Sequence, residues 1–317
     1  MTFEDNTAAL NAIRGAISQV IVGQTDVIDQ VLIAFLAKGH VLLEGVPGLG
    51  KTLLVRALAQ TFAGLYNRIQ FTPDLMPADI TGHVLYNMKE GQFTIRKGPV
   101  FANLLLADEI NRAPAKTQAA LLEVMQEHTV TIESKQMPVP LPFMVLATQN
   151  PIEQEGTYPL PEAELDRFIM KVVMSYPTEG EEIEILKRYN QQTENTVLDG
   201  LQAFLTDEHL LALQQAASDV HIDEQLFGYA TALVRQTRTD PKLIVGGGPR
   251  ASLAIVRCAK ARALLNGRNH AIPDDIQQVT LPVLRHRIVP STESELEGFT
   301  ADQLIQAIIQ SVAVPRQ

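Results

Sequence analysis

The glycine-rich segment GVPGLGKT, residues 45–52, constrains the fold of this chain more than any other part of its sequence. It follows a short apolar run, residues 40–44, and it precedes a helical pattern over residues 53–62. A strand, a glycine-rich turn and a helix in this order form a phosphate-binding loop, whose backbone N–H groups and helix N-terminus face phosphate oxygens. We predict that Lys51 reaches the β- and γ-phosphates of a nucleotide and that the Thr52 hydroxyl ligates Mg²⁺.

A chance glycine-rich turn is the alternative interpretation of this segment, and the flanking strand and helix patterns argue against it. The side chains and backbone groups expected around the nucleotide phosphates are those of Gly45, Val46, Pro47, Gly48, Leu49, Gly50, Lys51, Thr52 and Leu53.

Two adjacent carboxylates, Asp108 and Glu109, follow another apolar run at residues 103–107. Such a run is typical of a buried parallel strand, and ligands of parallel sheets bind at the carboxyl ends of the strands. We expect Asp108 to hold Mg²⁺, directly or through water, and Glu109 to polarise the attacking water as a general base. The alternative is a solvated acidic pair at a strand end.

A third apolar run, residues 143–147, leads to Asn150. Because it follows the same kind of strand, its side chain is expected to face the ligand crevice and to orient the lytic water. Taken alone, the dipeptide Asn150-Pro151 indicates only a turn.

Two arginines, Arg167 and Arg250, are candidates for stabilising charge on a transferring phosphoryl group. Arg167 precedes an apolar run at residues 168–173, and Arg250 follows the glycine run 246–248 that leads into a helical pattern. From the residues alone, a surface ion pair is an equally good interpretation of either arginine.

Apolar runs and helical patterns alternate through the first part of the chain, which predicts an α/β domain with a mainly parallel sheet. The Pro-, Gly- and Asp-rich residues 72–99 are interpreted as insertion and loop, and residues 129–140 as a hairpin. After Tyr176-Pro177 only helical patterns follow, beginning with capping-box spacing. We therefore predict a nucleotide-binding core over residues 1–177 and a smaller all-helical domain over residues 178–317.

The charge balance narrows the classes of partner. The chain has 317 residues and a formal net charge of −10, which argues against a surface that grips nucleic acid or anionic lipid throughout. Its N-terminus shows no signal-peptide pattern, and no apolar stretch approaches the roughly 20 residues that cross a bilayer. The single cysteine, Cys258, lies in an apolar run and is interpreted as a buried hydrophobe. We expect a cytoplasmic protein without membrane insertion.

No metal site apart from the nucleotide's is expected. The seven histidines are scattered without a close pair, so they are interpreted as structural or solvated. The carboxylates of Glu153, Glu155, Glu162 and Glu164 are interpreted as a solvated loop.

The motifs GVPGLGKT, LLLADEINRAPAKTQAALLEVMQE, ATQNPIEQEGTYPLPEAELDRF and GGGPRAS resemble those of the MoxR family of AAA+ ATPases, and the resemblance runs from about Ile21 to the end of the chain. It implies an AAA+ P-loop core, a helical lid, bound Mg-ATP and a ring, usually hexameric, in which a neighbour completes each site. It implies that Lys51 and Thr52 are the Walker A residues, that Asp108 and Glu109 are the Walker B residues, and that Asn150 is sensor 1 and Arg250 sensor 2. It also implies that Arg167 is a trans-acting arginine finger, with Arg112 as a competing trans-acting or structural arginine. Val22, Gly23 and Gln24 are implied to contact the adenine.

The resemblance also implies an insert at about residues 85–97, shared with magnesium chelatase and the MCM helicases. The tips of this insert and of the 129–140 hairpin each hold one lysine offset by one glutamate, which disfavours tracking along a nucleic-acid strand. The expected function is ATP-driven, chaperone-like remodelling of a separate protein, such as one with a von Willebrand factor A domain. The alternative is a nucleic-acid-stimulated motor. A GTPase or small-molecule kinase is disfavoured because the chain has no Asn-Lys-x-Asp run.

Overall fold

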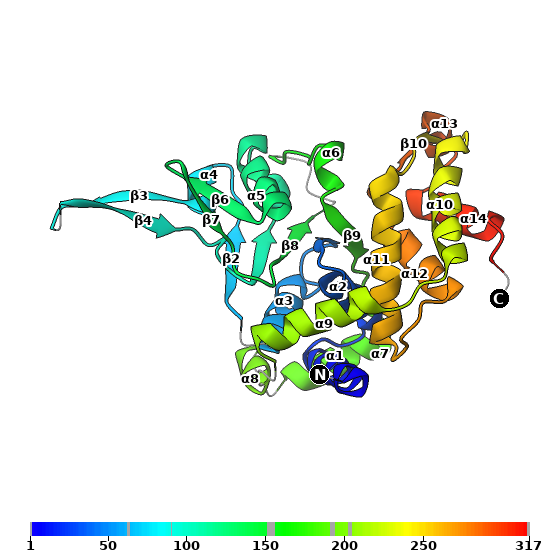
Figure 1. The fold of residues 1–317 in the computed structure, drawn as a ribbon, viewed down its shortest axis with the longest axis horizontal. Helices are drawn as coiled ribbons and strands as arrows, with labels where there is room; N and C mark the ends of the chain where they lie inside the picture. Colours follow the sequence, from blue (N-terminus) through cyan, green and yellow to red (C-terminus); the bar gives the residue numbers. More distant parts are fainter. Residues whose placement is uncertain are drawn as a thin grey trace.

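A five-stranded sheet organises the first part of the molecule (Figure 1). The computed structural model of the protein describes residues 2–61, 64–89, 91–150, 156–190, 194–201 and 205–315. The strand order is β2-β5-β8-β1-β9, and every pairing in this sheet is parallel. This confirms the predicted α/β core. The strands are β1 (His40–Glu44), β2 (Tyr66–Gln70), β5 (Leu104–Asp108), β8 (Met144–Gln149) and β9 (Phe168–Val173).

Both faces of the sheet are buried, which is why its strands read as continuous apolar runs. Alternate residues enter different cores: Val41 and Leu43 join the core beneath the first three helices, whereas Leu42 joins the core beneath α5. The helices of this part are α1 (Phe3–Val20), α2 (Thr25–Leu36), α3 (Lys51–Gln60), α4 (Pro77–Thr81), the 3₁₀ turn η1 (Ile110–Arg112), α5 (Ala115–Glu127) and α6 (Glu162–Leu165).

Parallel pairing gives the sheet two distinct edges. At the carboxyl edge, β1 ends at Glu44 and β5 ends at Asp108. At the opposite edge, which we call the amino edge, β1 begins at His40 beside Phe168 of β9. At roughly 3.3 Å per residue, about 15 Å of strand separates them. Groups at opposite edges therefore cannot share one small ligand.

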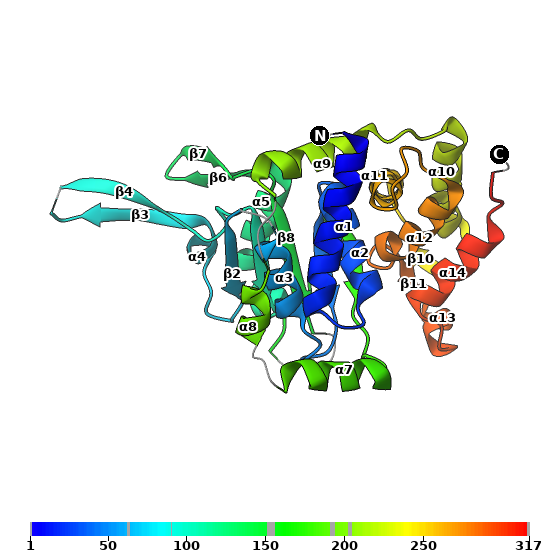
Figure 2. The ribbon, with the colours of Figure 1, turned by 90° about the horizontal axis from the view of Figure 1, so that it is seen from below.

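Two antiparallel hairpins extend from this core. The expected insert is a hairpin of β3 (Gly82–Asn87) and β4 (Gln92–Lys97). The prediction of a loop over residues 72–99 was therefore wrong for most of this hairpin, which is made of regular strands. The hairpin begins three residues before Leu85, the start expected from the resemblance. It projects far from the body in both views (Figures 1 and 2). The second hairpin, β6 (Thr129–Ile132) and β7 (Lys135–Pro138), confirms the hairpin predicted at residues 129–140.

The chain after residue 177 is predominantly helical, as expected. Its helices are α7 (Glu179–Tyr189), α8 (Glu194–Asp199), α9 (Asp207–Asp219), α10 (Glu224–Thr239), α11 (Pro249–Leu265), α12 (Pro273–Leu284), α13 (Thr292–Leu296) and α14 (Ala301–Ser311). The expectation of no strand in this part missed one short antiparallel pair, β10 (Leu243–Val245) and β11 (Val289–Pro290). These strands have only three and two residues, too few to show the alternation of apolar and polar side chains that predicts a strand.

The residues that follow α12 form hydrogen bonds with β9, an outermost strand of the sheet. His286 Nε2 donates to the Phe168 carbonyl (2.9 Å), and Arg285 Nη1 donates to the Lys171 carbonyl (3.3 Å). Arg287 Nη2 also donates to the Phe168 carbonyl (2.7 Å), and its Nε pairs with Asp166 Oδ1 (2.7 Å). We call residues 285–287 the β9 clamp. The clamp fixes the helical part against the amino edge.

No helix in the described ranges combines the length and the apolarity that a membrane crossing requires. The boundary placed near residue 177 stays a prediction, because α9 and α11 pack against α2 and share one hydrophobic core with it.

Candidate functional site

The phosphate loop lies at the carboxyl edge, between β1 and α3. Gly48 and Gly50 have φ of 87° and 82°, left-handed conformations that favour glycine and that turn the chain tightly into the helix. Lys51 begins α3, and its Nζ donates to the Gly45 carbonyl (2.7 Å) and to the Gln149 carbonyl at the end of β8 (3.4 Å). The ammonium thus lies within the turn, where it would meet a bound phosphate.

The two predicted carboxylates lie at the same edge, at the end of β5. Asp108 is buried, and its Oδ1 accepts a hydrogen bond from Thr148 Oγ1 (2.6 Å). The Glu109 backbone is left-handed, with φ of 55°, an uncommon conformation for a residue with a side chain. Its N–H donates to the same Thr148 hydroxyl (2.8 Å), so this hydroxyl links the two acidic residues to β8.

Side chains from β2 contact both carboxylates, and the sequence analysis did not identify them. Arg68 Nη2 pairs with Asp108 Oδ2 (2.6 Å), and Gln70 Nε2 donates to Glu109 Oε2 (2.8 Å). Neither residue belongs to a motif in the sequence. Their contacts follow from the register, which places Gln70 opposite Asp108.

The donor set at this edge fits Mg²⁺. A hydroxyl at position 52, on the first turn of α3, and a buried carboxylate at position 108 are hard oxygen ligands of the kind that Mg²⁺ binds. Within the described residues no group of three or more His, Cys, Asp or Glu side chains forms an alternative metal site.

Asn150 directly follows β8 and is buried at the carboxyl edge, as expected from its position in the strand series. Arg112, the alternative finger, lies at this edge as well. Its Nε pairs with Glu109 Oε2 of its own chain (3.1 Å). The structure thus gives Arg112 a contact within its own protomer.

A cavity of about 410 Å³ adjoins the phosphate loop, and its walls come from three parts of the chain. We call it the nucleotide cavity. Val22 and Gln24 lie on one side, as expected for the adenine-contacting segment, and Gly48 to Gly50 lie on another. The third wall, Pro177, Ile185 and Tyr189, belongs to the region around α7, which sequence reasoning assigned no role in binding.

Glu181 caps its own helix, α7, and also lies against the segment that contains Val22 and Gln24. The Thr178 backbone N–H donates to Glu181 Oε2 (2.7 Å), the capping interaction expected from their spacing. The Glu181 carboxyl lies directly against Gly23, where an added Cβ would come within 2.3 Å of its Cδ. Gly23 also has φ of 74°, a left-handed conformation that favours glycine.

Arg167 and Arg250 lie together, but at the amino edge. Arg167 Nε pairs with Glu164 Oε2 (2.7 Å), and its Nη1 donates to the Leu122 carbonyl (2.8 Å). Arg250 Nη1 lies 3.6 Å from Asp166 Oδ2, and its side chain is 66% exposed. Within the described residues neither arginine contacts the phosphate loop of its own chain.

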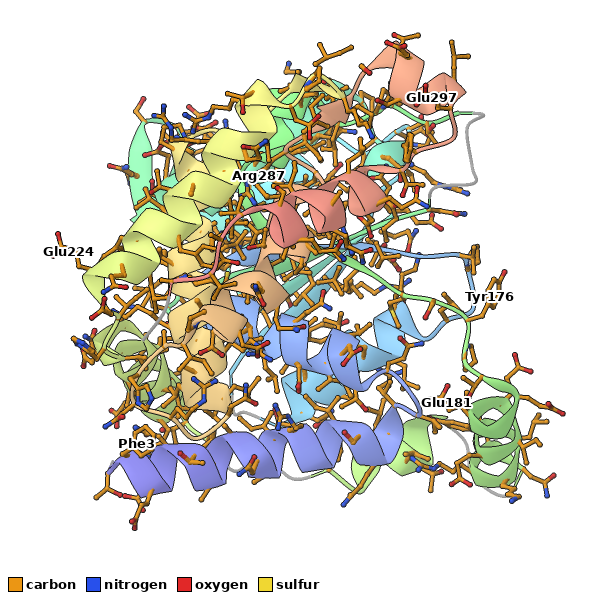
Figure 3. The ribbon with its side chains drawn as sticks, turned by 90° about the vertical axis from the view of Figure 1, so that its right-hand side faces the viewer. Phe3, Tyr176, Glu181, Glu224, Arg287 and Glu297 are labelled. Carbon is orange, nitrogen blue, oxygen red and sulfur yellow. The ribbon has the colours of Figure 1, made fainter. Side chains whose placement is uncertain are left out.

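Both arginines line a hollow of about 470 Å³ that is rich in positive charge. We call it the arginine hollow. Its charged and titratable lining residues are Lys38, His40, His128, Asp166, Arg167, Arg250, Arg257 and Arg287. Burial lowers the pKa of the Arg287 guanidinium, and the hydrogen bond to Asp166 opposes this shift. In Figure 3, Arg287 lies well apart from Glu181, which belongs to α7.

The remaining candidates are structural where the structure describes them. Burial lowers the pKa of His40 to about 4, and its ring is held between the Val145 N–H (3.0 Å) and the Met125 carbonyl (3.1 Å). Cys258 is buried, which raises the pKa of its thiol to about 12 and makes it unreactive. Glu164 pairs with Arg167. Glu153 and Glu155 lie outside the described residues.

Known proteins match both parts of this arrangement. The ATPase family associated with various cellular activities (AAA) matches residues 40–170, and the AAA lid domain matches residues 235–308. Chaperone MoxR1 of Mycobacterium tuberculosis is 44% identical over 309 residues, which cover 95% of this chain and 81% of that protein. Protein MoxR of Methylorubrum extorquens is 33% identical over 94% of this chain and 93% of that protein.

The chain belongs to the MoxR family of AAA+ ATPases. Another similar protein is YeaC of Bacillus subtilis, which is 45% identical over 95% of this chain and 93% of its own length. A crystal structure described as that of an ATPase from Cytophaga hutchinsonii has a TM-score of 0.91 at 41% identity and covers 99% of this chain and 97% of that one. The MoxR-family chain is therefore an ATP hydrolase that binds nucleotide.

Proposed function

We propose that this ATPase uses Mg-ATP hydrolysis to remodel or activate a separate protein, as one member of a ring in which each nucleotide site is shared by two copies. The observation that carries the shared site is the location of Arg167 and Arg250 at the amino edge, one strand length from the phosphate loop of their own chain. A second copy that docks its carboxyl edge on the arginine hollow would receive both guanidinium groups.

Within one site, the roles divide between the two copies. Lys51 and the backbone N–H groups of the phosphate loop bind the phosphates, and Thr52 and Asp108 would hold Mg²⁺. The metal, when bound, neutralises charge on the phosphate oxygens. Glu109 takes a proton from the attacking water, which Asn150 orients. Arg167 and Arg250 of the neighbouring copy stabilise the negative charge that develops on the transferred phosphoryl group.

Charge supports the docking of two copies in this orientation. The arginine hollow contains four arginines and Lys38 against the single carboxylate of Asp166. Its positive charge complements the phosphates of a bound nucleotide and the carboxylates of Asp108 and Glu109. A head-to-tail contact of this kind closes into a ring when its rotation permits, and the family resemblance suggests six copies.

A protein client is better supported than nucleic acid. One close relative is named a chaperone, and the whole chain is acidic, with a formal net charge of −10. The β6–β7 tip combines Glu133 with Lys135, so it offers no run of positive charge to a phosphate backbone. We propose a client that is a separate chain, for which a von Willebrand factor A domain protein is our first candidate, and a cytoplasmic location, which suits the single buried thiol.

Mixing two inactive variants tests the shared site. Arg167→Ala keeps its own phosphate loop, and Lys51→Ala keeps its arginines, so an interface that combines the intact half of each has every group. We expect each variant alone to be inactive, with turnover reduced about 10³-fold or more for Arg167→Ala. The mixture should regain a fraction of the wild-type ATPase rate.

The controls establish that mixed assemblies form. Sedimentation should show oligomers of the same size for both variants and for their mixture. Absence of rescue in confirmed mixed oligomers would mean that Arg167 does not act in trans, and Arg112 would become the candidate.

A further inference from the structure

The β3–β4 hairpin presents an apolar face that the rest of the described chain does not cover. The cross-strand register pairs Val84 with Ile95 and Tyr86 with Phe93, which places all four side chains on one face. Val84 and Ile95, nearer the body, pack on the core beneath α5. Farther out, Tyr86 is 54% exposed and Phe93 is 75% exposed, with their ring centroids 5.1 Å apart.

Met88, at the end of the same hairpin, adds to this surface. It is 89% exposed, more than any other large hydrophobic residue that the structure describes. A single exposed apolar side chain is ordinary on a protein surface. Here an aromatic pair and a flexible methionine adjoin one another at the end of a projection, which is typical of a binding surface. We call Tyr86, Met88 and Phe93 the hairpin patch.

The hairpin backbone is also available to a partner. β3 and β4 pair with each other, and within the described residues neither has a second neighbouring strand. Their outer edges therefore present a row of backbone N–H and C=O groups to solvent. An extended polypeptide adds to such an edge as a further strand, and alternate side chains of the added strand then face the patch.

Charge distinguishes this hairpin from the rest of the molecule. Between residues 82 and 97 the chain carries Lys89, Arg96 and Lys97 against the single acid Glu90, whereas the whole chain has a formal net charge of −10. Lys89 and Arg96 are exposed. A locally basic surface beside an apolar patch complements a segment that combines apolar with acidic side chains.

The position of the hairpin argues against a second copy as the occupant. The nucleotide cavity and the arginine hollow, through which copies are proposed to meet, lie on the body of the molecule, whereas the hairpin projects away from it (Figures 1 and 2). Tyr86 and Phe93 offer rings on which bases can stack, but the most exposed side chain of the patch, Met88, offers neither charge nor a flat ring. The chain also carries a formal net charge of −10, so we favour polypeptide over nucleic acid.

We propose that the hairpin patch binds extended, acidic and apolar segments of the client protein. The proposal rests on the proposed function for the identity of this polypeptide as the client, but the binding itself needs no ATP hydrolysis. The aromatic pair and Met88 contact apolar side chains of the segment, and Lys89 and Arg96 attract its carboxylates. An open edge of β3 or β4 pairs with its backbone.

Fluorescence anisotropy with defined probes tests this binding. The probe is a labelled synthetic peptide in which Phe and Glu alternate, and its matched controls are the same peptide with Lys in place of Glu and a labelled oligodeoxythymidine. The double variant Tyr86→Ser, Phe93→Ser should weaken binding of the Glu peptide about tenfold or more. Exchanging the exposed Phe227 and Leu296 for Ser, on α10 and α13, should leave the affinity unchanged.

Two further variants separate the components of the surface. Met88→Ser alters a side chain too exposed to support folding, and it should weaken binding several-fold even if the double variant is unstable. The double variant Lys89→Glu, Arg96→Glu should bind the Glu peptide more weakly than the wild type does. Because its hairpin is acidic, it should bind the Lys peptide more tightly than the Glu peptide, the reverse of the wild-type preference. ATPase rates of the same preparations report on the proposed function separately, because a wild-type protein that binds the peptide without hydrolysing ATP contradicts only that function.

Four outcomes would overturn the proposal. These are no measurable binding of the Glu peptide to the wild-type protein, equal affinity in the wild type and in the hairpin variants, tighter binding of oligodeoxythymidine than of the peptide, and a changed oligomeric state of the Tyr86→Ser, Phe93→Ser protein with unchanged peptide affinity. The third would identify a nucleic-acid surface, and the fourth a contact between copies.

Discussion

The two edges of the central sheet hold the two groups of candidate catalytic residues, and these groups are assembled differently. At the carboxyl edge, Lys51 follows β1 through the phosphate loop, Asp108 ends β5 and Asn150 directly follows β8, so the order of the strands brings them together. At the amino edge, Arg167 comes from the turn before β9 and Arg250 from the first turn of α11. The first group is a local consequence of the motif, whereas the second exists only once the helical part has docked.

In the proposed ring, this difference would distinguish groups that act on the nucleotide of their own chain from groups that act on a neighbour's. If the comparison is right, substitutions at the carboxyl edge impair a single copy, and substitutions at the amino edge impair only the assembly. Substitutions at Lys51, Glu109 and Arg250 test that distinction.

Lys51→Ala should abolish nucleotide binding, because it removes the ammonium that lies within the phosphate loop. We expect calorimetry to show an ATP affinity lowered about a hundredfold or more, at any protein concentration. Lys38→Ala, which removes a lysine from the arginine hollow, is the matched control and should bind ATP as the wild type does. An unchanged affinity in Lys51→Ala would remove the assignment of this loop.

Glu109→Gln should separate binding from turnover at the same edge. The amide cannot accept a proton from water, so we expect the ATPase rate to fall about 10²- to 10⁴-fold while ATP still binds. Glu123→Gln, an exposed position on α5, is the control and should hydrolyse ATP at the wild-type rate. Wild-type turnover in Glu109→Gln would exclude Glu109 as the base.

Arg250→Ala should reveal the opposite behaviour at the amino edge. We expect the ATPase rate of the assembly to fall about tenfold or more, because an exposed guanidinium no longer reaches the neighbour's phosphates. Nucleotide affinity, measured by calorimetry after dilution to monomers, should equal that of the wild type. A lowered monomer affinity would contradict the comparison and assign Arg250 to its own nucleotide.

The amino edge should also respond to acid, through His40. Its pKa is lowered from 6.5 to about 4 by burial, so between these values the unfolded chain binds more protons than the folded one. The free energy of unfolding is therefore not reduced by His40 above pH 6.5, and it falls by about 3 kcal/mol as the pH decreases from 6.5 to about 4.

Urea unfolding across this pH range measures the effect. The buried His286 has a pKa well below 6.5 for the same first reason, so it contributes a loss in the same direction. His40→Gln should be less stable than the wild type at neutral pH but should lose less stability on acidification. An identical pH dependence in the two proteins would show that His40 does not titrate in the unfolding transition.

How much the sequence predicts follows from the same comparison of edges. The strand-loop-helix around Lys51, the strand before Asp108 and the capping box at Thr178 are local patterns, and the structure bears them out as local geometry. The contacts of Arg68 and Gln70 with the two carboxylates depend on which strand lies beside β5, and no local pattern contains that information.

The grouping of Arg167 with Arg250 had a different obstacle. Each arginine adjoins a motif that is recognisable in the sequence. Their proximity in space, however, depends on the hydrogen bonds that join the end of α12 to β9. Those bonds end on backbone carbonyls, and a backbone acceptor leaves no trace in the amino-acid sequence. The hairpin patch was hidden for a similar reason, because exposure of Tyr86 and Phe93 depends on what the fold leaves uncovered.

The β9 clamp has a consequence for how sequences of this type can change. The contacts of Arg285, His286 and Arg287 with β9 end on the backbone carbonyls of Phe168, Ile169 and Lys171, a group that every amino acid possesses. Substitutions along β9 therefore need only preserve strand geometry and packing, and they require no compensating change in the clamp. The clamp residues themselves have no such freedom, and two side-chain partners must be retained with them: Asp166 for Arg287 and Asp302 for Arg285.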